Sequence, residues 1–355
     1  MTRLARNPLH WGVLGIVVAL AACSDQARAP GIEIQRRVSF GDTTGEGALA
    51  GGAFISPRLP LGYVTTTPWG EPNLPALFDS SGGFVRLLGR SGEGPGEFRG
   101  AQSMLVLGDS LLIVDNQLQR ATVFDDSLRL IRHFPMGERP WKLLLLADGS
   151  YLASVGIFQR RAPFTHLSRD GAALGRVGVI PEREEMPIHA MARAADGSVW
   201  TARMSGRMEF THYDQALNRN GGFTPVREWF PAAEPFTMPS PSQPPASGVT
   251  GIWLDSSDRL WVAGFTADPE WSEGLGPERT GEGGIKYHPV TDARLAYDGI
   301  IDVYDSKSGS LLATLRDDDR WVDLAEPGVL VRAAEIGDGW TQLTLWAVRW
   351  RQAGP

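Results

Sequence analysis

Short runs of alternating apolar and polar residues, separated by acidic or glycine turns, fill most of this chain. Runs such as GDSLLIVDN (108–116) and DGSVWTAR (196–203) begin at a turn and continue with β-branched and aromatic residues. Alternation over so few positions predicts short β-strands. Helical periodicity is nearly absent after residue 22. The sequence therefore predicts an all-β fold.

Two strand elements recur in strict alternation. The first is a β-rich run behind a turn, at 59–67, 108–116, 148–155, 196–203, 257–264 and 326–335. The second is a short strand that ends at a large apolar anchor: Phe78, Phe124, Leu167, Tyr213, Tyr304 and Trp346, which are 46, 43, 46, 91 and 42 residues apart. A period of roughly 40–50 residues is typical of four-stranded propeller blades. We therefore expect a six-bladed β-propeller over 32–350, since a two-sheet sandwich, the alternative, would not explain a constant period.

The two ends of the repeated region complement each other. The last unit stops one strand short, and IEIQRRVSF (32–40) is a strand without a unit of its own. We expect this N-terminal strand to supply the outer strand of the last blade, because that pairing closes the ring and removes an open edge. Residues 351–355 remain as a tail.

The first residues indicate export. Arg3 and Arg6 precede the apolar run WGVLGIVVALAA (11–22), which is shorter than the roughly 20 residues that span a bilayer and suits a secretory signal. The run ends in LAAC, and small residues before a cysteine resemble the lipobox of bacterial lipoproteins. We expect a signal peptide at 1–22, lipidation at Cys23 and an anchor segment at 23–31; an ordinary signal peptide is the alternative. Ser24 at the next position favours the outer membrane, on its periplasmic or cell-surface side.

The cysteine count and the net charge limit which kinds of partner this protein can bind. Cys23 is the single cysteine, so no internal disulfide forms. Loss of the two arginines of 1–22 takes the formal net charge from −7 to −9, and no basic run is present. We therefore expect no nucleic acid as a partner. The expected partners are the lipid bilayer, through acylated Cys23, and an unknown envelope protein or small ligand.

The glycine-rich stretch LLGRSGEGPGEFRG (87–100) has the appearance of a phosphate-binding loop. A dinucleotide fingerprint needs glycines that open a helix after a strand. Here Gly92, Gly94 and Gly96 are followed by Glu97, Phe98 and another β-run, Pro95 removes a donor amide, and two glutamates repel phosphate. We interpret the stretch as the connection between blades one and two, with Phe98 filling the space between them.

The same stretch carries a family resemblance. GEGPGEF (92–98), followed by a strand, an acidic turn and LLIVDNQLQRATVFD (111–125), resembles the six-bladed β-propeller lipoproteins of bacteria, which are themselves similar to NHL-repeat propellers. The resemblance extends over most of 32–350. It implies the fold and an envelope location, and it implies little about activity.

Long connections predict where binding occurs. The stretch 87–100, a proline-rich segment at about 231–248 and an irregular segment at about 266–298 all fall on one face of the propeller by strand order. Long loops on one face of a rigid scaffold commonly bind ligands; tolerated surface insertion is the alternative. Aligned on the following turns, Trp141, His189 and Thr250 form one column at the channel mouth, with Trp321 near it. They are candidate binding residues, and packing between blades is the alternative role.

Catalytic and metal signals are weak. His166 and His212 occupy the same place in adjacent units, but apolar residues stand there in the other units, which favours packing over a metal site. A G-x-S-x-G motif and a calcium loop are missing. We expect no metal and no cofactor. The preferred function is a lipid-anchored binding module that uses the loop-rich face. The alternatives are a propeller hydrolase or lyase acting at the channel mouth on an envelope carbohydrate or lactone, and a purely structural envelope subunit.

Overall fold

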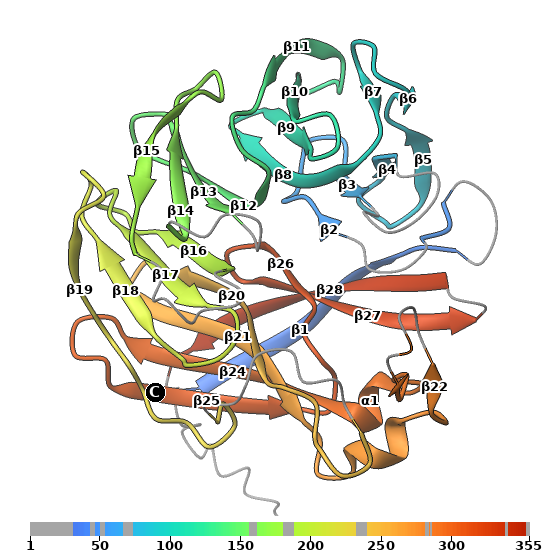
Figure 1. The fold of residues 1–355 in the computed structure, drawn as a ribbon, viewed down its shortest axis with the longest axis vertical. Coiled ribbons are helices and arrows are strands. Elements are labelled where there is room, and N and C mark those ends of the chain that lie inside the picture. Colours follow the sequence, from blue (N-terminus) through green and yellow to red (C-terminus); the bar gives the residue numbers. More distant parts are fainter. Residues whose placement is uncertain are drawn as a thin grey trace, which may run out of the picture.

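The chain forms six antiparallel four-stranded sheets arranged as the blades of a β-propeller, which confirms the predicted fold class (Figure 1). The computed structural model describes residues 31–42, 47–49, 54–66, 74–155, 162–179, 188–231, 240–280, 284, 286–337 and 340–352. Cys23 lies outside these residues, as do the signal peptide and nearly all of the anchor segment. No helix among the described residues is long and apolar enough to cross a bilayer.

Each blade runs from an inner strand at the axis to an outer strand at the rim. Blade 1 has β2 (Phe54–Ile55), β3 (Tyr63–Thr66), β4 (Ala76–Phe78) and β5 (Phe84–Leu87). Blade 2 has β8 (Ala101–Leu107), β9 (Ser110–Asp115), β10 (Arg120–Phe124) and β11 (Leu130–Pro135). Blade 3 has β12 (Pro140–Leu145), β13 (Tyr151–Val155), β14 (Phe164–Leu167) and β15 (Ala173–Val177).

The remaining blades follow the same order. Blade 4 has β16 (His189–Arg193), β17 (Val199–Arg203), β18 (Phe210–Tyr213) and β19 (Arg219–Phe223). Blade 5 has β20 (Gly248–Leu254), β21 (Arg259–Ala267), β24 (Tyr297–Asp305) and β25 (Leu311–Asp317). Blade 6 has β26 (Asp323–Glu326), β27 (Val329–Gly337), β28 (Trp340–Arg351) and, as its outer strand, β1 (Gly31–Phe40).

The N-terminal strand closes the ring, as the sequence predicts. β1 pairs with β28 from Gly31 opposite Arg351 to Phe40 opposite Leu343. Phe40 is 1% exposed and packs edge-on against Tyr63 and Phe78 of blade 1. The first strand therefore completes the sixth blade and also fills the seam between the sixth blade and the first.

Apolar side chains fill the spaces between neighbouring blades, because a single blade cannot bury both faces of its sheet. Phe98 lies in one such cluster with Leu77 of blade 1 and Leu111 of blade 2. Another cluster joins Phe210 of blade 4 to Val262 of blade 5. The hydrophobic core is thus a series of clusters arranged around the ring.

Aspartates fix the turns that follow the predicted anchors. Asp79, Asp125, Asp214 and Asp305 each accept hydrogen bonds from main-chain N–H groups two to four residues further on. Ser168 does the same in blade 3. These bonds favour the charged carboxylate and hold the pKa of each aspartate below its usual range; at Asp79 the Ser81 hydroxyl, which also donates to the carboxylate, has the largest effect.

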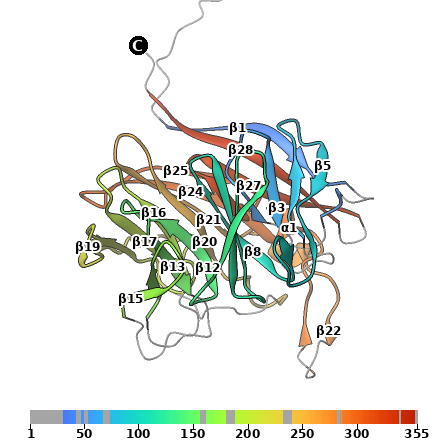
Figure 2. The same ribbon diagram turned by 90° about the horizontal axis from the view of Figure 1, so that it is seen from above.

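Strand order gives the propeller two different faces. The loop face carries the connections from each outer strand to the next inner strand and from each second strand to the third. The turn face carries the other turns. Since outer strands run from the turn face to the loop face, β1 begins on the turn face. Figure 2 shows β1 and the hairpin strand β22 (Arg279–Thr280), which belongs to the loop face, at opposite sides of the molecule.

Candidate functional site

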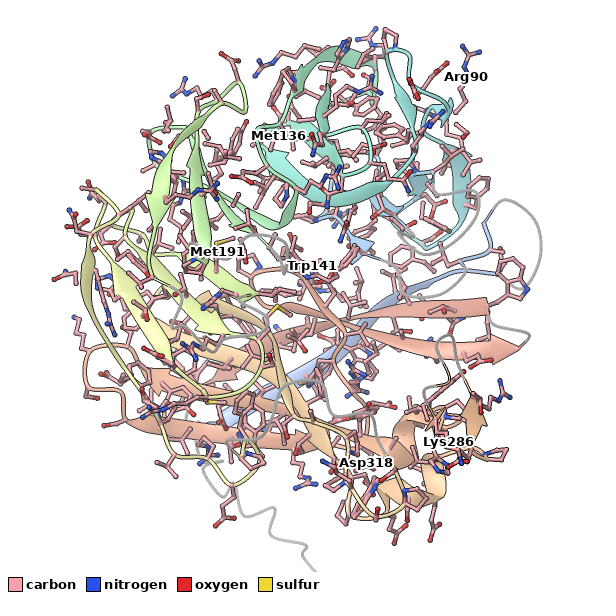
Figure 3. All side chains as sticks on the ribbon, in the orientation of Figure 1. Arg90, Met136, Trp141, Met191, Lys286 and Asp318 are labelled. Carbon is pink, nitrogen blue, oxygen red and sulfur yellow. The ribbon has the colours of Figure 1, made fainter. Side chains whose placement is uncertain are left out.

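The inner strands of all six blades surround an axial cavity of about 390 Å³. Trp141 and Met191 project toward the middle of the ring from β12 and β16 (Figure 3). Ligand pockets of small molecules commonly enclose about 300–1,000 Å³. The cavity is therefore large enough to hold a small ligand.

Most of the cavity wall is apolar. Met104, Leu144, Met191, Leu254 and Leu324 line it, and each of these side chains is partly exposed. They come from five different blades, so the apolar wall continues around the axis. Apolar surface that remains wet inside a concave site favours binding of an apolar group, because burial removes that surface from water.

An ion pair crosses the axis near the loop face. Lys142 Nζ lies 2.6 Å from Asp323 Oδ1, and these residues belong to blades 3 and 6, which stand opposite each other in a ring of six. The same Nζ lies 5.2 Å from the centre of the Phe54 ring of blade 1. That ring is 6.2 Å from the ring of Trp141 in an edge-to-face arrangement. Charge and aromatic rings therefore converge at the loop-face end of the cavity.

The structure separates the four binding residues proposed from sequence. Trp141 and Thr250 line the cavity, and both lie at register shifts that follow Pro140 and Val249. His189 is 8% exposed and packs against Phe164. Neither His189 nor the fully buried Trp321 belongs to the cavity wall.

Hydroxyl groups join consecutive blades around the cavity. Thr66 Oγ1 donates to the carbonyl oxygen of Gln102, Ser103 Oγ to that of Trp141, and Thr250 Oγ1 to that of Trp321. Buried carbonyl groups need such partners. Thr250 and the main chain of Trp321 are thus engaged in holding blades 5 and 6 together.

Four residues that the sequence did not single out supply charge to the cavity wall: Lys142, Arg193, Asp323 and Glu326. Lys142 is one of three lysines in the chain and the single charged residue in the run PWKLLLLA (140–147). A lysine inside an apolar inner strand was a signal for an internal ion pair. Its partner could not be found from sequence, because Asp323 lies 181 positions away.

Charged side chains of the glycine-rich connection form hydrogen bonds within that connection. Glu97 accepts hydrogen bonds from Arg90 Nε at 2.5 Å and from the N–H of Gly94 at 2.7 Å. Phe98 is 1% exposed and stacks on Phe124. The Glu97 carboxylate therefore takes up the Gly94 N–H group and the Arg90 guanidinium, two donors that a phosphate would need.

Two long segments of the loop face contact each other. The connection between β21 and β24 contains a 3-10 helix, η1 (Trp271–Gly274), the hairpin β22 and β23 (Lys286–Tyr287), and a short helix, α1 (Ala293–Ala296). The Trp271 Nε1–H group donates to the carbonyl oxygen of Ser240, which belongs to the proline-rich connection. Leu275 and Val290 form a bridge at the base of the hairpin. Residues 232–239 of the proline-rich connection lie outside the described residues.

The two equivalent histidines make different contacts. His166 Nε2 lies 2.8 Å from Ser150 Oγ, and that hydroxyl donates to Asp148. His212 stacks on Trp200 with ring centres 4.8 Å apart. Because Ser150 gives its proton to the aspartate, His166 acts as the donor to Ser150 and does not activate it as a nucleophile. Within the part of the chain that the structure describes, no group of three or more His, Cys, Asp or Glu side chains could hold a metal ion.

Comparison with solved structures places the fold among bacterial propellers. The chain is similar to a member of the DUF4221 family from Bacteroides vulgatus, with 9% sequence identity, a TM-score of 0.60, and coverage of 92% of this chain and 100% of that chain. It is also similar to a Bacteroides fragilis protein described as exported, with 10% identity, a TM-score of 0.55, and coverage of 90% and 96%. No protein-family model and no curated protein matches the sequence. At these identities the likeness shows the propeller fold alone.

Proposed function

We propose that this protein is an exported, lipid-anchored propeller that binds a partner through its loop face. The observation that carries the proposal is the convergence of two long connections, joined by the hydrogen bond from Trp271 to Ser240, on one face of a rigid ring. Binding residues are commonly found on loops that a rigid scaffold positions. The resemblance to bacterial propeller lipoproteins supports the same location.

The direction of the chain supports this use of the loop face. β1 begins on the turn face, so an anchor attached at Cys23 would reach the propeller from that side. The hairpin of β22 and β23 lies on the opposite side (Figure 2). A propeller held in this way presents its loop face away from the bilayer, where a soluble or envelope partner reaches it.

A hydrolase or lyase acting at the cavity is less well supported. Such an enzyme needs a general acid or base that is free to exchange a proton with the substrate. Lys142 and Asp323 neutralise each other, and Ser103 Oγ donates to the carbonyl oxygens of Pro140 and Trp141. These contacts favour a binding role for the cavity.

Photo-crosslinking in living cells tests the proposal. Lys286 on the hairpin and Lys307 on the turn face are both exposed residues of blade 5, and each is replaced in turn by a photo-reactive amino acid. We expect a crosslinked product of defined mass from position 286 and none from position 307. Equal products from both positions, or no product from 286 and from the neighbouring Arg279, would contradict a loop-face partner. Products from neither face would favour a purely structural subunit.

A further inference from the structure

The charged residues at the two ends of the axial cavity form different ion pairs. At the loop-face end, Lys142 and Asp323 are paired at 2.6 Å. At the turn-face end, the wall contains Arg193 and Glu326. Glu326 pairs with Arg37 at 3.7 Å, which partly offsets its negative charge.

Arg193 keeps its charge available. Its side chain is exposed, and its Nη1 donates to the carbonyl oxygen of Leu145 at 3.2 Å, which orients the guanidinium without neutralising it. No carboxylate of the described residues forms an ion pair with it. An arginine has further N–H donors for a carboxylate or phosphate group. The turn-face mouth therefore has one oriented cation above an apolar cavity.

We propose that the axial cavity binds a single-chain amphiphile with an anionic head group, with the head at Arg193 and the tail directed toward Trp141. The wall between these residues supplies apolar contacts from Leu144, Met191 and Leu254. The paired charges of Lys142 and Asp323 lie at the far end, so the tail ends where the cavity becomes polar. This site goes beyond the proposed loop-face function, since the exposed Arg193 lies at the end of β16 on the opposite face.

The cavity volume limits the length of the ligand. One molecule of liquid water occupies about 30 Å³, and a methylene group is of similar size. A cavity of about 390 Å³ therefore accepts a chain of roughly ten to twelve carbons. A fatty acid and an alkyl phosphate of that length share the required chemistry. The mouth lies on the face where β1 begins, which is the side from which an anchored chain would meet a bilayer and its amphiphiles.

Brominated fatty acids provide the probe, because bromine quenches tryptophan fluorescence at contact distance. Residues 23–355 with Cys23→Ser are used, because a chain without both the lipid and the apolar run at 11–22 needs no detergent. We expect 12-bromododecanoate to quench the emission more strongly than 2-bromododecanoate. That difference disappears in a Trp141→Phe variant, because a tail-end bromine lies beside Trp141. Equal quenching by the two isomers would overturn the proposed orientation.

Competition and variants test the site itself. With no substitution in the cavity wall, unbrominated laurate and dodecyl phosphate displace 12-bromododecanoate and restore the fluorescence. The cationic dodecyltrimethylammonium does not. Arg193→Gln weakens laurate about tenfold, which corresponds to loss of one charge-assisted contact. Arg129→Gln, a matched change on the turn face outside the cavity, leaves the affinity unchanged. Met191→Trp fills the cavity and abolishes quenching.

Two results would refute the proposal. The first is that neither bromo acid gives quenching that laurate can reverse. This result is obtained without any cavity variant, so it does not depend on whether a variant folds. The second is an affinity that Arg193→Gln and Met191→Trp leave unchanged in variants with wild-type circular dichroism. Crosslinking from position 286 is also measured with and without laurate. The crosslinks test the loop-face partner and the quenching tests the axial cavity, so either proposal can fail while the other holds.

Discussion

Asp302 provides the sharpest test of how the loop face is held in place. This carboxylate is fully buried in β24 and accepts five hydrogen bonds. Arg227 supplies two of them, at 2.8 and 3.0 Å. The others come from Trp229 Nε1, the Tyr304 hydroxyl and Thr314 Oγ1. Burial, together with the charge of Asp302, raises the pKa of Tyr304, so its hydroxyl stays a donor. The proline-rich connection begins at about residue 231, two positions after Trp229, and Asp302 thus fixes the chain just before it.

The cost of Asp302→Ala follows from the groups that it leaves without a partner. Removing one member of a buried ion pair costs about 3–5 kcal/mol, because the other charge remains buried. Arg227 is 21% exposed, so water offsets part of this cost. Trp229 Nε1 and the Tyr304 hydroxyl also lose their acceptor, at about 1–3 kcal/mol each when buried. With the ion-pair cost reduced by solvent to about 2 kcal/mol and about 1 kcal/mol for each of the two donors, we expect a total loss of about 4 kcal/mol and a melting temperature roughly 8 °C lower.

A double-mutant cycle measured by urea and thermal unfolding checks this value. Asp302→Ala, Arg227→Met and the double variant are compared. We expect the double variant to be less destabilised than the sum of the singles by about 2 kcal/mol, since it leaves no unpaired charge. Asp170→Ala, which breaks an exposed pair with Arg132, serves as control and costs less than about 1 kcal/mol. Additive effects, or an Asp302→Ala cost as small as the control's, would refute the assigned role of Asp302.

Further predictions concern the anchor, the ring, the turns and the cavity. Cys23→Ser releases the protein from membrane fractions into the soluble fraction, and unchanged membrane retention would contradict lipidation. Phe40→Ala opens the seam between blades 6 and 1 and lowers the free energy of unfolding by about 3–5 kcal/mol; a melting curve equal to wild type would exclude the closure as a stabilising feature. The Ser150 hydroxyl lowers the pKa of Asp148 in the folded protein. The charged Asp148 therefore stabilises the fold above its unfolded pKa of about 3.9, and this stabilisation is lost as the pH falls below that value. The melting temperature then decreases between about pH 5 and pH 2, and less steeply in Ser150→Ala; parallel curves for the two proteins would contradict this. Lys142→Met leaves the buried carboxylate of Asp323 unpaired and lowers the free energy of unfolding by about 2 kcal/mol. The double variant Lys142→Met, Asp323→Leu recovers most of that loss. A double variant as unstable as Lys142→Met would contradict the pairing.

The sequence by itself determined the six blades and their closure, because the signals involved are local. Alternation of apolar residues marks a strand within a few positions, and an aspartate after a buried anchor such as Phe124 marks the turn that follows. Repetition of these local signals fixed the blade count. The unpaired strand at 32–40 then predicted the closure, since a ring leaves one place for it.

Side-chain direction at the axis depended on features that the sequence does not show. The extra residues at the register shifts in β12 and β20 are Trp141 and Thr250, and both line the cavity. β16 has no such shift, so His189 stays in the ladder opposite Arg203 and packs against Phe164. A bulge adds one residue and changes which side chains share a face, and alignment on turns does not detect it.

Contacts across the ring were decided by the tertiary structure alone. Lys142 and Asp323 meet because blades 3 and 6 stand opposite each other, and Arg227 reaches Asp302 through the seam between blades 4 and 5. Each pair joins residues far apart in sequence, and no local pattern specifies such a partner. The sequence thus determined which strands form and in what order, through hydrogen bonding and alternation over short distances. Closure of the ring decided which charges and apolar side chains share the axial cavity, because it brings distant inner strands to one axis.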